Sequence, residues 1–183
     1  MNTSLKRNSP LKRNPLLNDR DIQEALQEIK EKAGKQKIML VGGAALHFYG
    51  SDRLTGDLDI VSLAPIAGLR NESALSIGGY TSHTSKGVEV DLIIPERKIT
   101  RLYTDALLNA KNLPECPIPV ISLEHILVMK MQAHRRKDEV DVVNIFNLSG
   151  FDAQKAKALV KKFLGEYALH DFETYQWEAS RSR

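Results

Sequence analysis

The spacing of hydrophobic positions changes several times along the first sixty residues, and each change predicts a new element. Between Asn18 and Gly34 the apolar side chains recur at helical intervals, so a capped helix is expected there. Short, mainly apolar segments at 37–41 and 57–63 predict two buried strands, with a short helix at 44–49 between them. The chain is therefore expected to begin as helix, strand, helix, strand.

The middle of the chain carries a hairpin pattern. Two predicted strands, 80–84 and 88–94, flank Ser-Lys-Gly, a short turn with glycine where left-handed backbone is needed. The preceding segment, 64–78, has no clear periodicity and is expected to be a loop with one helical turn. An amphipathic helix is expected at 99–107, and a short strand at 118–121, between prolines and a serine.

The last third of the sequence is helical in its pattern. Three helices are expected, at about 123–135, 138–148 and 152–169. The remainder contains three aromatic residues and is either a docked tail or a disordered one. The whole order of elements predicts an α+β (or α/β) domain, in which helices flank a mixed β-sheet and the C-terminal third is helical.

Composition limits the class of protein. The 183 residues are 42% hydrophobic, which suits a compact globular domain, and the net charge of +3 is too small to indicate nucleic-acid binding by itself. No apolar run approaches the ~18 residues of a membrane span, so no membrane partner is expected. A single cysteine excludes an internal disulfide and fits a reducing cytoplasm, the predicted location.

Residues 1–17 form a basic arm that is expected to be disordered. Its first thirteen residues include Lys6, Arg7, Lys12 and Arg13 with no acidic residue, and prolines interrupt the segment. The arm is either a solvated tail or a segment that contacts the phosphates of RNA, in which case affinity would fall steeply with salt.

Two aspartates interrupt an otherwise apolar segment. Asp57 and Asp59 are two residues apart on a predicted strand, so their side chains share one face. Two carboxylates about 4 Å apart repel by roughly 4 kcal/mol at an effective dielectric near 20, and a hard cation such as Mg²⁺ relieves that repulsion. Asp91 lies mid-strand in the hairpin and is favoured as a third acid over Glu89, which lies nearer the turn. The alternative is that the aspartates cap turns or pair with Arg53 and Lys86.

Gly42 and Gly43 supply a complementary feature. A strand that runs into two glycines and a short helix presents bare backbone N–H groups, which favour phosphate. A glycine pair alone is weak evidence, because any tight turn would use it. The combination of Gly-Gly, Asp-Leu-Asp and a later strand aspartate is much more specific.

These motifs resemble the polymerase-beta-type nucleotidyltransferase superfamily. The run "RLTGDLDI" resembles its minimal bacterial branch, the abortive-infection (type IV toxin–antitoxin) nucleotidyltransferase toxins, and the resemblance covers roughly residues 20–150. It implies a nucleotidyltransferase-like core at 18–122, C-terminal helices packed on it at 123–170, and a tail at 171–183.

The resemblance also implies an activity and its residues. Asp57, Asp59 and Asp91 would be the catalytic residues and would bind two Mg²⁺ ions, while Gly42 and Gly43 would hold the phosphates of a nucleoside triphosphate. The expected reaction transfers a nucleoside monophosphate to an acceptor hydroxyl. For a toxin-type enzyme the acceptor would be RNA, such as tRNA, or protein, and an antitoxin would be a partner. The alternatives are transfer to a small, aminoglycoside-like molecule, or a nucleotide-binding module without turnover.

Charged residues fall on the apolar stripes of the later helices. Lys130 and His134 lie on one stripe, and Asp138 and Asp141 lie on the next. Lys130 is either a phosphate contact or a lysine paired with Asp141. Asp138 is either part of the nucleotide site or a helix N-cap, and His134 is expected in the core or beside the site. The run "KMQAHRRKDEVDV" resembles the family's later motif, which adds Lys130 and Asp138 to the predicted nucleotide-binding residues.

Overall fold

The computed structural model describes residues 15–96 and 99–181. The predicted basic arm falls almost entirely outside this range, at 1–14. Its last described residue, Leu17, is tied to the domain because its backbone N–H donates to the carbonyl of Thr55 at 2.8 Å.

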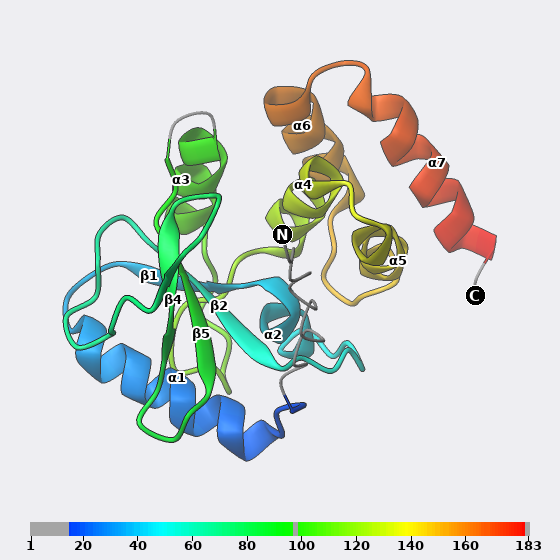
Figure 1. Cartoon of the computed structure of the whole chain (residues 1–183). Coiled ribbons are helices and arrows are strands. Elements are labelled where there is room, and N and C mark those ends of the chain that lie inside the picture. Colours follow the sequence, from blue (N-terminus) through cyan, green and yellow to red (C-terminus); the bar gives the residue numbers. More distant parts are fainter. Residues whose placement is uncertain (1–14, 97–98, 182–183) are drawn as a thin grey trace, which may run out of the picture.

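The described part of the chain begins as helix, strand, helix, strand, continues with three more strands and ends in helices alone (Figure 1). In order, the elements are α1 (Asp19–Ala33), β1 (Ile38–Val41), α2 (Gly42–His47), β2 (Asp57–Ser62), β3 (Ser73–Ala74), β4 (Gly79–His83), β5 (Glu89–Ile93), α3 (Thr100–Leu108), α4 (Leu123–Ala133), α5 (Arg136–Ile145), α6 (Ala153–Leu164) and α7 (Ala168–Arg181).

The strands form one mixed sheet in the order β1-β2-β5-β4-β3. β2 and β5 are parallel, and the other three neighbouring pairs are antiparallel. The predicted α+β fold with a mixed sheet and flanking helices is confirmed. The parallel pair brings two segments that are about thirty residues apart in the chain into register.

The first helix begins and ends as its sequence predicts. Asn18 caps it by accepting from the backbone N–H of Asp21 at 2.9 Å, and the Asp21 carboxylate accepts in return from the Asn18 N–H. Gly34, with a φ of 57°, ends it. The apolar stripe of the helix is buried in the core, which places α1 against the domain along its whole length.

Two expectations about local structure are wrong, and a third feature, which the sequence left open, is decided. The segment 118–121 is not a strand; Val120 forms only isolated bridges to Leu40 and Lys111, because the flanking prolines lack the N–H groups of a longer ladder. The segment 64–78 contains the short strand β3. The tail left open between docking and disorder is the helix α7, which packs on α5 and α6 and buries Phe172.

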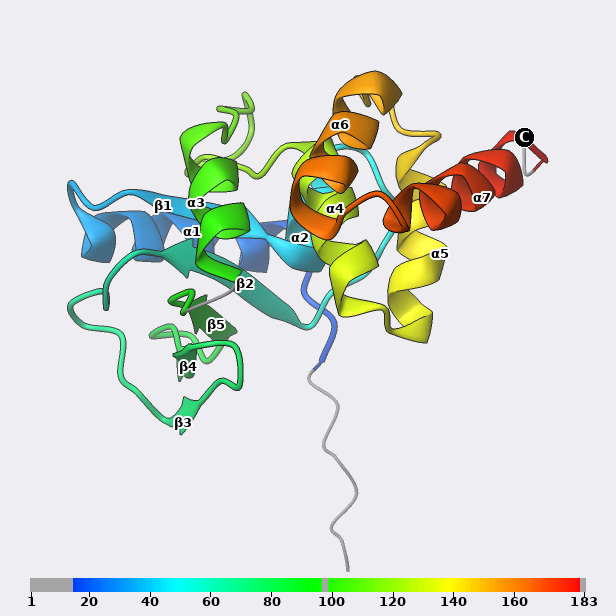
Figure 2. The ribbon, with the colours of Figure 1, turned by 90° about the horizontal axis from the view of Figure 1, so that it is seen from above.

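The helices α4 to α7 gather beside the sheet (Figures 1 and 2). α4 is the buried member of this group and packs against both α5 and α6. Its apolar residues belong to the same core as β1, β2 and β5. No helix in residues 15–96 and 99–181 combines the length and the apolarity that a membrane crossing needs.

Two glycines lock the β3–β4 turn against β5. Gly78 and Gly79 have φ values of 98° and 95°, and a Cβ on Gly79 would overlap the Leu92 carbonyl oxygen. The Ile94 N–H donates to the Gly78 carbonyl at 3.2 Å. The turn is therefore held directly over the end of β5.

Replacing Gly79 by alanine should destabilise the fold by about 3 kcal/mol, because both the backbone conformation and the Leu92 carbonyl oppose a side chain. Gly87→Ala is the matched control, since Gly87 has a φ of 81° but open space where a Cβ would lie. Urea unfolding should show a loss of about 1 kcal/mol for the control. Equal losses of unfolding free energy in the two variants would contradict the claim that Gly79 holds the β3–β4 turn against β5.

Candidate active site

The parallel register of β2 and β5 sets two aspartates side by side. Asp59 pairs with Asp91, and Asp57 pairs with Glu89. Since alternate residues on a strand share a face, all four acids project from the same face of the sheet. The placement of Asp91 beside Asp59 agrees with the choice of Asp91 over Glu89, which lies at the other end of the strand next to His83.

Gly42 is a glycine because the Asp59 carboxylate occupies the space of a side chain. A Cβ on Gly42 would overlap Asp59 Oδ2, and the φ of Gly42 is 70°. Val41, the preceding residue, pairs with Asp59 across β1 and β2. The carboxylate therefore lies directly against the backbone at the point where β1 turns into α2.

Gly43 makes room for the loop that leads into β2. A Cβ there would lie 3.1 Å from Arg53 Nε and 3.2 Å from Thr55 Oγ1. The space over this glycine is thus filled by the protein's own side chains. The glycine pair is also the first turn of α2 rather than a loop before it.

Hydroxyl groups orient two of the carboxylates. Thr55 Oγ1 donates to Asp57 Oδ1 at 2.9 Å, and Thr81 Oγ1 donates to Asp91 Oδ1 at 2.7 Å. The predicted alternative, that these aspartates pair with Arg53 and Lys86, is wrong, because Arg53 pairs with Asp141 and Lys86 with Glu24. Neutral donors fix the direction of a carboxylate without cancelling its charge.

The carboxyl of Asp59 has a clearly raised pKa. Burial, together with the charges of Asp57 and Asp91, raises the pKa of its carboxyl to about 7, while Lys130 and Lys137 act in the opposite sense. The structure records no ion pair to Asp59 among the described residues. A carboxyl in this position gains stability from any cation that reaches it.

A cavity of about 270 Å³ opens over this face of the sheet. Its polar lining includes Gly42, Asp59, Asp91, Lys130 and Arg135. The apolar lining comes from the strand ends, the β3–β4 turn and α4, and comprises Val41, Leu75, Ile77, Ile93, Ile121, Ile126, Met129 and Ala133. Carboxylates and cations therefore face each other across one concave site.

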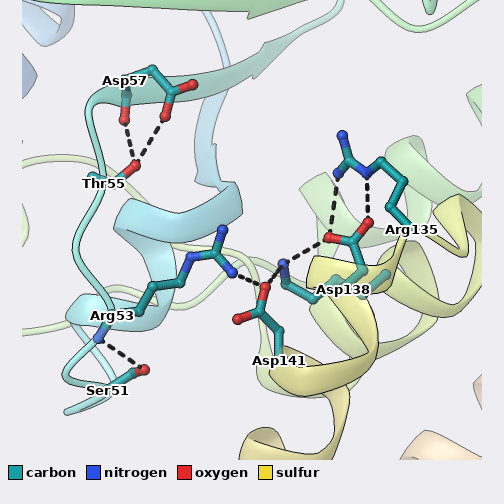
Figure 3. Close-up of polar contacts among 8 residues, drawn as sticks. Ser51, Arg53, Thr55, Asp57, Arg135, Asp138 and Asp141 are labelled. Carbon is teal, nitrogen blue, oxygen red and sulfur yellow. Dashed lines mark hydrogen bonds and ion pairs between the residues drawn. The ribbon is translucent and has the colours of Figure 1, made fainter. Parts of the chain in front are cut away.

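A chain of ion pairs connects the loop before β2 to the later helices (Figure 3). Asp141 accepts from Arg53 Nη1 and also from Lys130 Nζ, the latter at 2.5 Å. Asp138 accepts from Lys130 Nζ at 3.4 Å and from Arg135 Nε at 2.6 Å. Three cations and two carboxylates thus alternate along one edge of the site.

Burial affects the pKa values of Lys130 and Asp138, two buried members of this series of ion pairs, in different ways. Burial first, then the Arg53 charge, lowers the pKa of Lys130 to about 8. Burial would raise the pKa of Asp138, but the hydrogen bond from Arg135 and the charge of Lys130 hold it below its usual value. Asp138 therefore stays ionised and fixes the two cations.

The structure brings some predicted site residues together and leaves others at the border. Gly42, Asp59, Asp91 and Lys130 line the cavity, and Lys130 is also the lysine paired with Asp141. The residues outside the lining are Asp57, Gly43 and Asp138.

At the α4–α5 connection the structure excludes one of the two alternatives expected for Asp138 and one of the two expected for His134. Asp138 is not an N-cap, because α5 begins at Arg136 and Asp138 lies in its first turn. His134 is not in the core: it follows the last residue of α4 in the left-handed conformation, with a φ of 48°, and is exposed. Because α4 ends two residues earlier than expected, His134 lies outside the helix and faces solvent.

Sequence reasoning missed several residues that shape the site. Arg135 lines the cavity, and its side chain is 61% exposed. Thr55 and Thr81 orient the aspartates, and the β3–β4 turn supplies one wall. Thr55 stands inside "RLTGDLDI" and could have been noticed there; the pairing of Thr81 with Asp91 follows only from the strand register.

The carboxylates match the chemistry of a divalent-cation site but do not close around an ion by themselves. Hard cations take carboxylate oxygens, and here three carboxylates share one face with no cationic partner within residues 15–96 and 99–181. In the same range, no group of three His, Cys, Asp or Glu side chains is close enough to hold a metal ion. The donor set therefore fits a cation whose remaining ligands come from a substrate or water.

Replacing Asp59 by asparagine should raise the melting temperature, because it removes a carboxyl that is costly to ionise in the fold. The unfolded carboxyl ionises near 3.8 and the folded one near 7, so the wild-type protein loses stability as the pH rises between these values. The gain in melting temperature should be small at pH 4.5 and several degrees at pH 8. Asp52→Asn, at an exposed site, is the control. A gain in melting temperature that does not depend on pH would contradict the claim that ionised Asp59 destabilises the fold.

Replacing Asp141 by asparagine should destabilise the protein by about 3 kcal/mol, because Arg53 and Lys130 both lose the negative charge with which they pair. Glu139→Gln, on the same helix, should change the free energy of unfolding by about 0.5 kcal/mol or less. Denaturant unfolding measures the free energy of unfolding of each variant. Similar values for the two variants would show that Asp141 does not join the loop before β2 to the helices α4 and α5.

Comparison with solved structures identifies the fold. An antigenic nucleotidyltransferase-like protein from Paracoccidioides brasiliensis is similar over 88% of this chain and 94% of its own, with a TM-score of 0.50 and 18% identity. A candidate nucleotidyltransferase from H. pylori is similar over 89% of this chain and 84% of its own, with a TM-score of 0.49 and 13% identity. No protein-family model and no curated protein matches the chain. The chain therefore has a nucleotidyltransferase-like fold.

Proposed function

We propose that this protein is a metal-dependent nucleotidyltransferase, which transfers a nucleoside monophosphate from a nucleoside triphosphate to an acceptor hydroxyl. One observation carries the proposal: Asp59 and Asp91 lie side by side in parallel register, against the Gly42 backbone and without an ion-pair partner among the described residues. The nucleotidyltransferase-like fold and the cavity over these residues support it.

Asp57, Asp59 and Asp91 would hold the divalent cations. When bound, such cations offset the carboxylate repulsion and polarise phosphate oxygens. Their binding would also remove the penalty that raises the pKa of Asp59.

Cations of the protein itself face the same cavity. Lys130 and Arg135 would balance the charge of the triphosphate, and Asp138 keeps both in place from behind. Arg135 is the more accessible of the two, because Lys130 is buried and paired with Asp141. Gly42 would act on the nucleotide only through Asp59, because the Asp59 carboxylate occupies the space where a side chain at Gly42 would stand.

Asp91 would receive the proton of the acceptor hydroxyl. Thr81 donates to its Oδ1, which leaves Oδ2 for the acceptor hydroxyl. The acceptor oxygen would bond to the α-phosphorus as its proton passes to Asp91, and the bond from that phosphorus to the pyrophosphate oxygen would break. Pyrophosphate would leave with the electron pair of that bond.

RNA is the acceptor class that we propose, as in the toxin-type enzymes that the sequence resembles. The supporting observation is the basic segment at residues 6–13, which carries four lysine and arginine side chains without an acid. Under the same resemblance an antitoxin would be the natural protein partner.

Incubation with labelled nucleoside triphosphate, Mg²⁺ and total cellular RNA should transfer label to RNA and release pyrophosphate. Asp59→Asn and Asp91→Asn should each abolish transfer while the protein remains folded by circular dichroism. Asp52→Asn should transfer at the wild-type rate. Pyrophosphate release that persists in both site variants would refute the proposed function, whereas label on protein or a small molecule would replace only the acceptor.

A further inference from the structure

The cavity continues beyond the carboxylates into an aliphatic slot. Along β5, Asp91 is followed on the same face by Ile93, and the Gly78 backbone bonds to the next residue, Ile94. Since two strand residues span about 6.6 Å, the lining changes from charged to apolar over the length of one strand step.

Two elements enclose this apolar part. Leu75, Ser76 and Ile77 of the β3–β4 turn form one wall, and Ile126 and Met129 of α4 form the other. The glycine lock at Gly78 and Gly79 holds the turn in place. Ile77 lines the cavity and is 40% exposed, so part of its side chain is accessible to a ligand there.

We propose that this slot, between the β3–β4 turn and α4, binds the nucleobase of the nucleoside triphosphate through apolar contacts to the faces of the base. The proposal rests on the proposed function and names the substrate group next to the phosphates. At about 270 Å³ the cavity lies near the small end of the ~300–1,000 Å³ range of ligand pockets, so it suits part of a small molecule rather than a macromolecule.

The lining determines which bases are distinguished. Its aliphatic side chains offer no hydrogen bond, and the Ser76 hydroxyl is the polar side chain on the turn. An apolar wall discriminates by buried area and discriminates poorly between groups of similar shape. Purine triphosphates should therefore bind about tenfold tighter than pyrimidine triphosphates, and ATP and GTP should differ by about threefold or less.

Calorimetry with Mg²⁺ and either ATP or inorganic tripolyphosphate separates the base from the phosphates. Ile77→Ser should weaken ATP binding about tenfold and leave tripolyphosphate binding unchanged. Arg135→Gln should weaken both ligands, because its charge faces the phosphates. Leu63→Ser, at a 53% exposed site outside the cavity lining, is the control and should change neither.

The possible failures are distinct. Equal binding of ATP and tripolyphosphate by the wild-type protein, or an Ile77→Ser variant that weakens both or neither, would overturn the base slot while the phosphate site stands. Binding of neither ligand by the wild-type protein would overturn both this inference and the proposed function.

Discussion

The parallel pairing of β2 with β5 is the constraint on which the site depends. It fixes Asp59 beside Asp91, although the two residues are far apart in the chain. Two carboxylates on neighbouring strands, side by side and partly buried, repel each other by several kcal/mol. The fold tolerates this because Gly42 gives the Asp59 carboxylate a place against bare backbone and because hydroxyls orient its neighbours. What the fold leaves uncompensated is negative charge, and that charge is the basis of the proposed cation and nucleotide chemistry.

A second interaction joins the sheet to the helical third. Arg53 crosses over Gly43 and pairs with Asp141 of α5, which in turn holds Lys130 of α4. The loop that enters β2 is thus tied to the helices that form the far wall of the cavity. The glycine pair therefore has a structural task at both positions: Gly42 admits a carboxylate, and Gly43 admits a guanidinium. The sequence interpretation had given both glycines to phosphate alone.

The elements that sequence predicts well are those governed by local rules. The capped helix α1 follows from Asn18, Asp21 and Gly34, and the hairpin follows from alternating runs around a glycine turn. Burial of Lys130 and of two acids on later stripes also follows from helical spacing. Each of these depends on residues a few positions apart.

The parts that sequence does not predict depend on contacts between distant segments. The register that sets Asp91 beside Asp59 and Thr81 comes from strand pairing, and the apolar wall around Ile77 exists because Gly78 and Gly79 pack on β5. The end of α4 before His134 is decided by how the chain must turn to start α5. The helical spacing of apolar residues continues past the end of α4, so the sequence pattern wrongly assigns His134 to that helix.

Manganese binding followed by electron paramagnetic resonance tests the central claim most directly. If the acids on β2 and β5 form a cation site, the wild-type protein binds Mn²⁺ specifically, more tightly when a nucleoside triphosphate is present, and Asp91→Asn weakens that binding by about tenfold or more while the fold remains intact. Weak Mn²⁺ binding that is the same in the wild-type protein and in the Asp91→Asn variant would contradict the account.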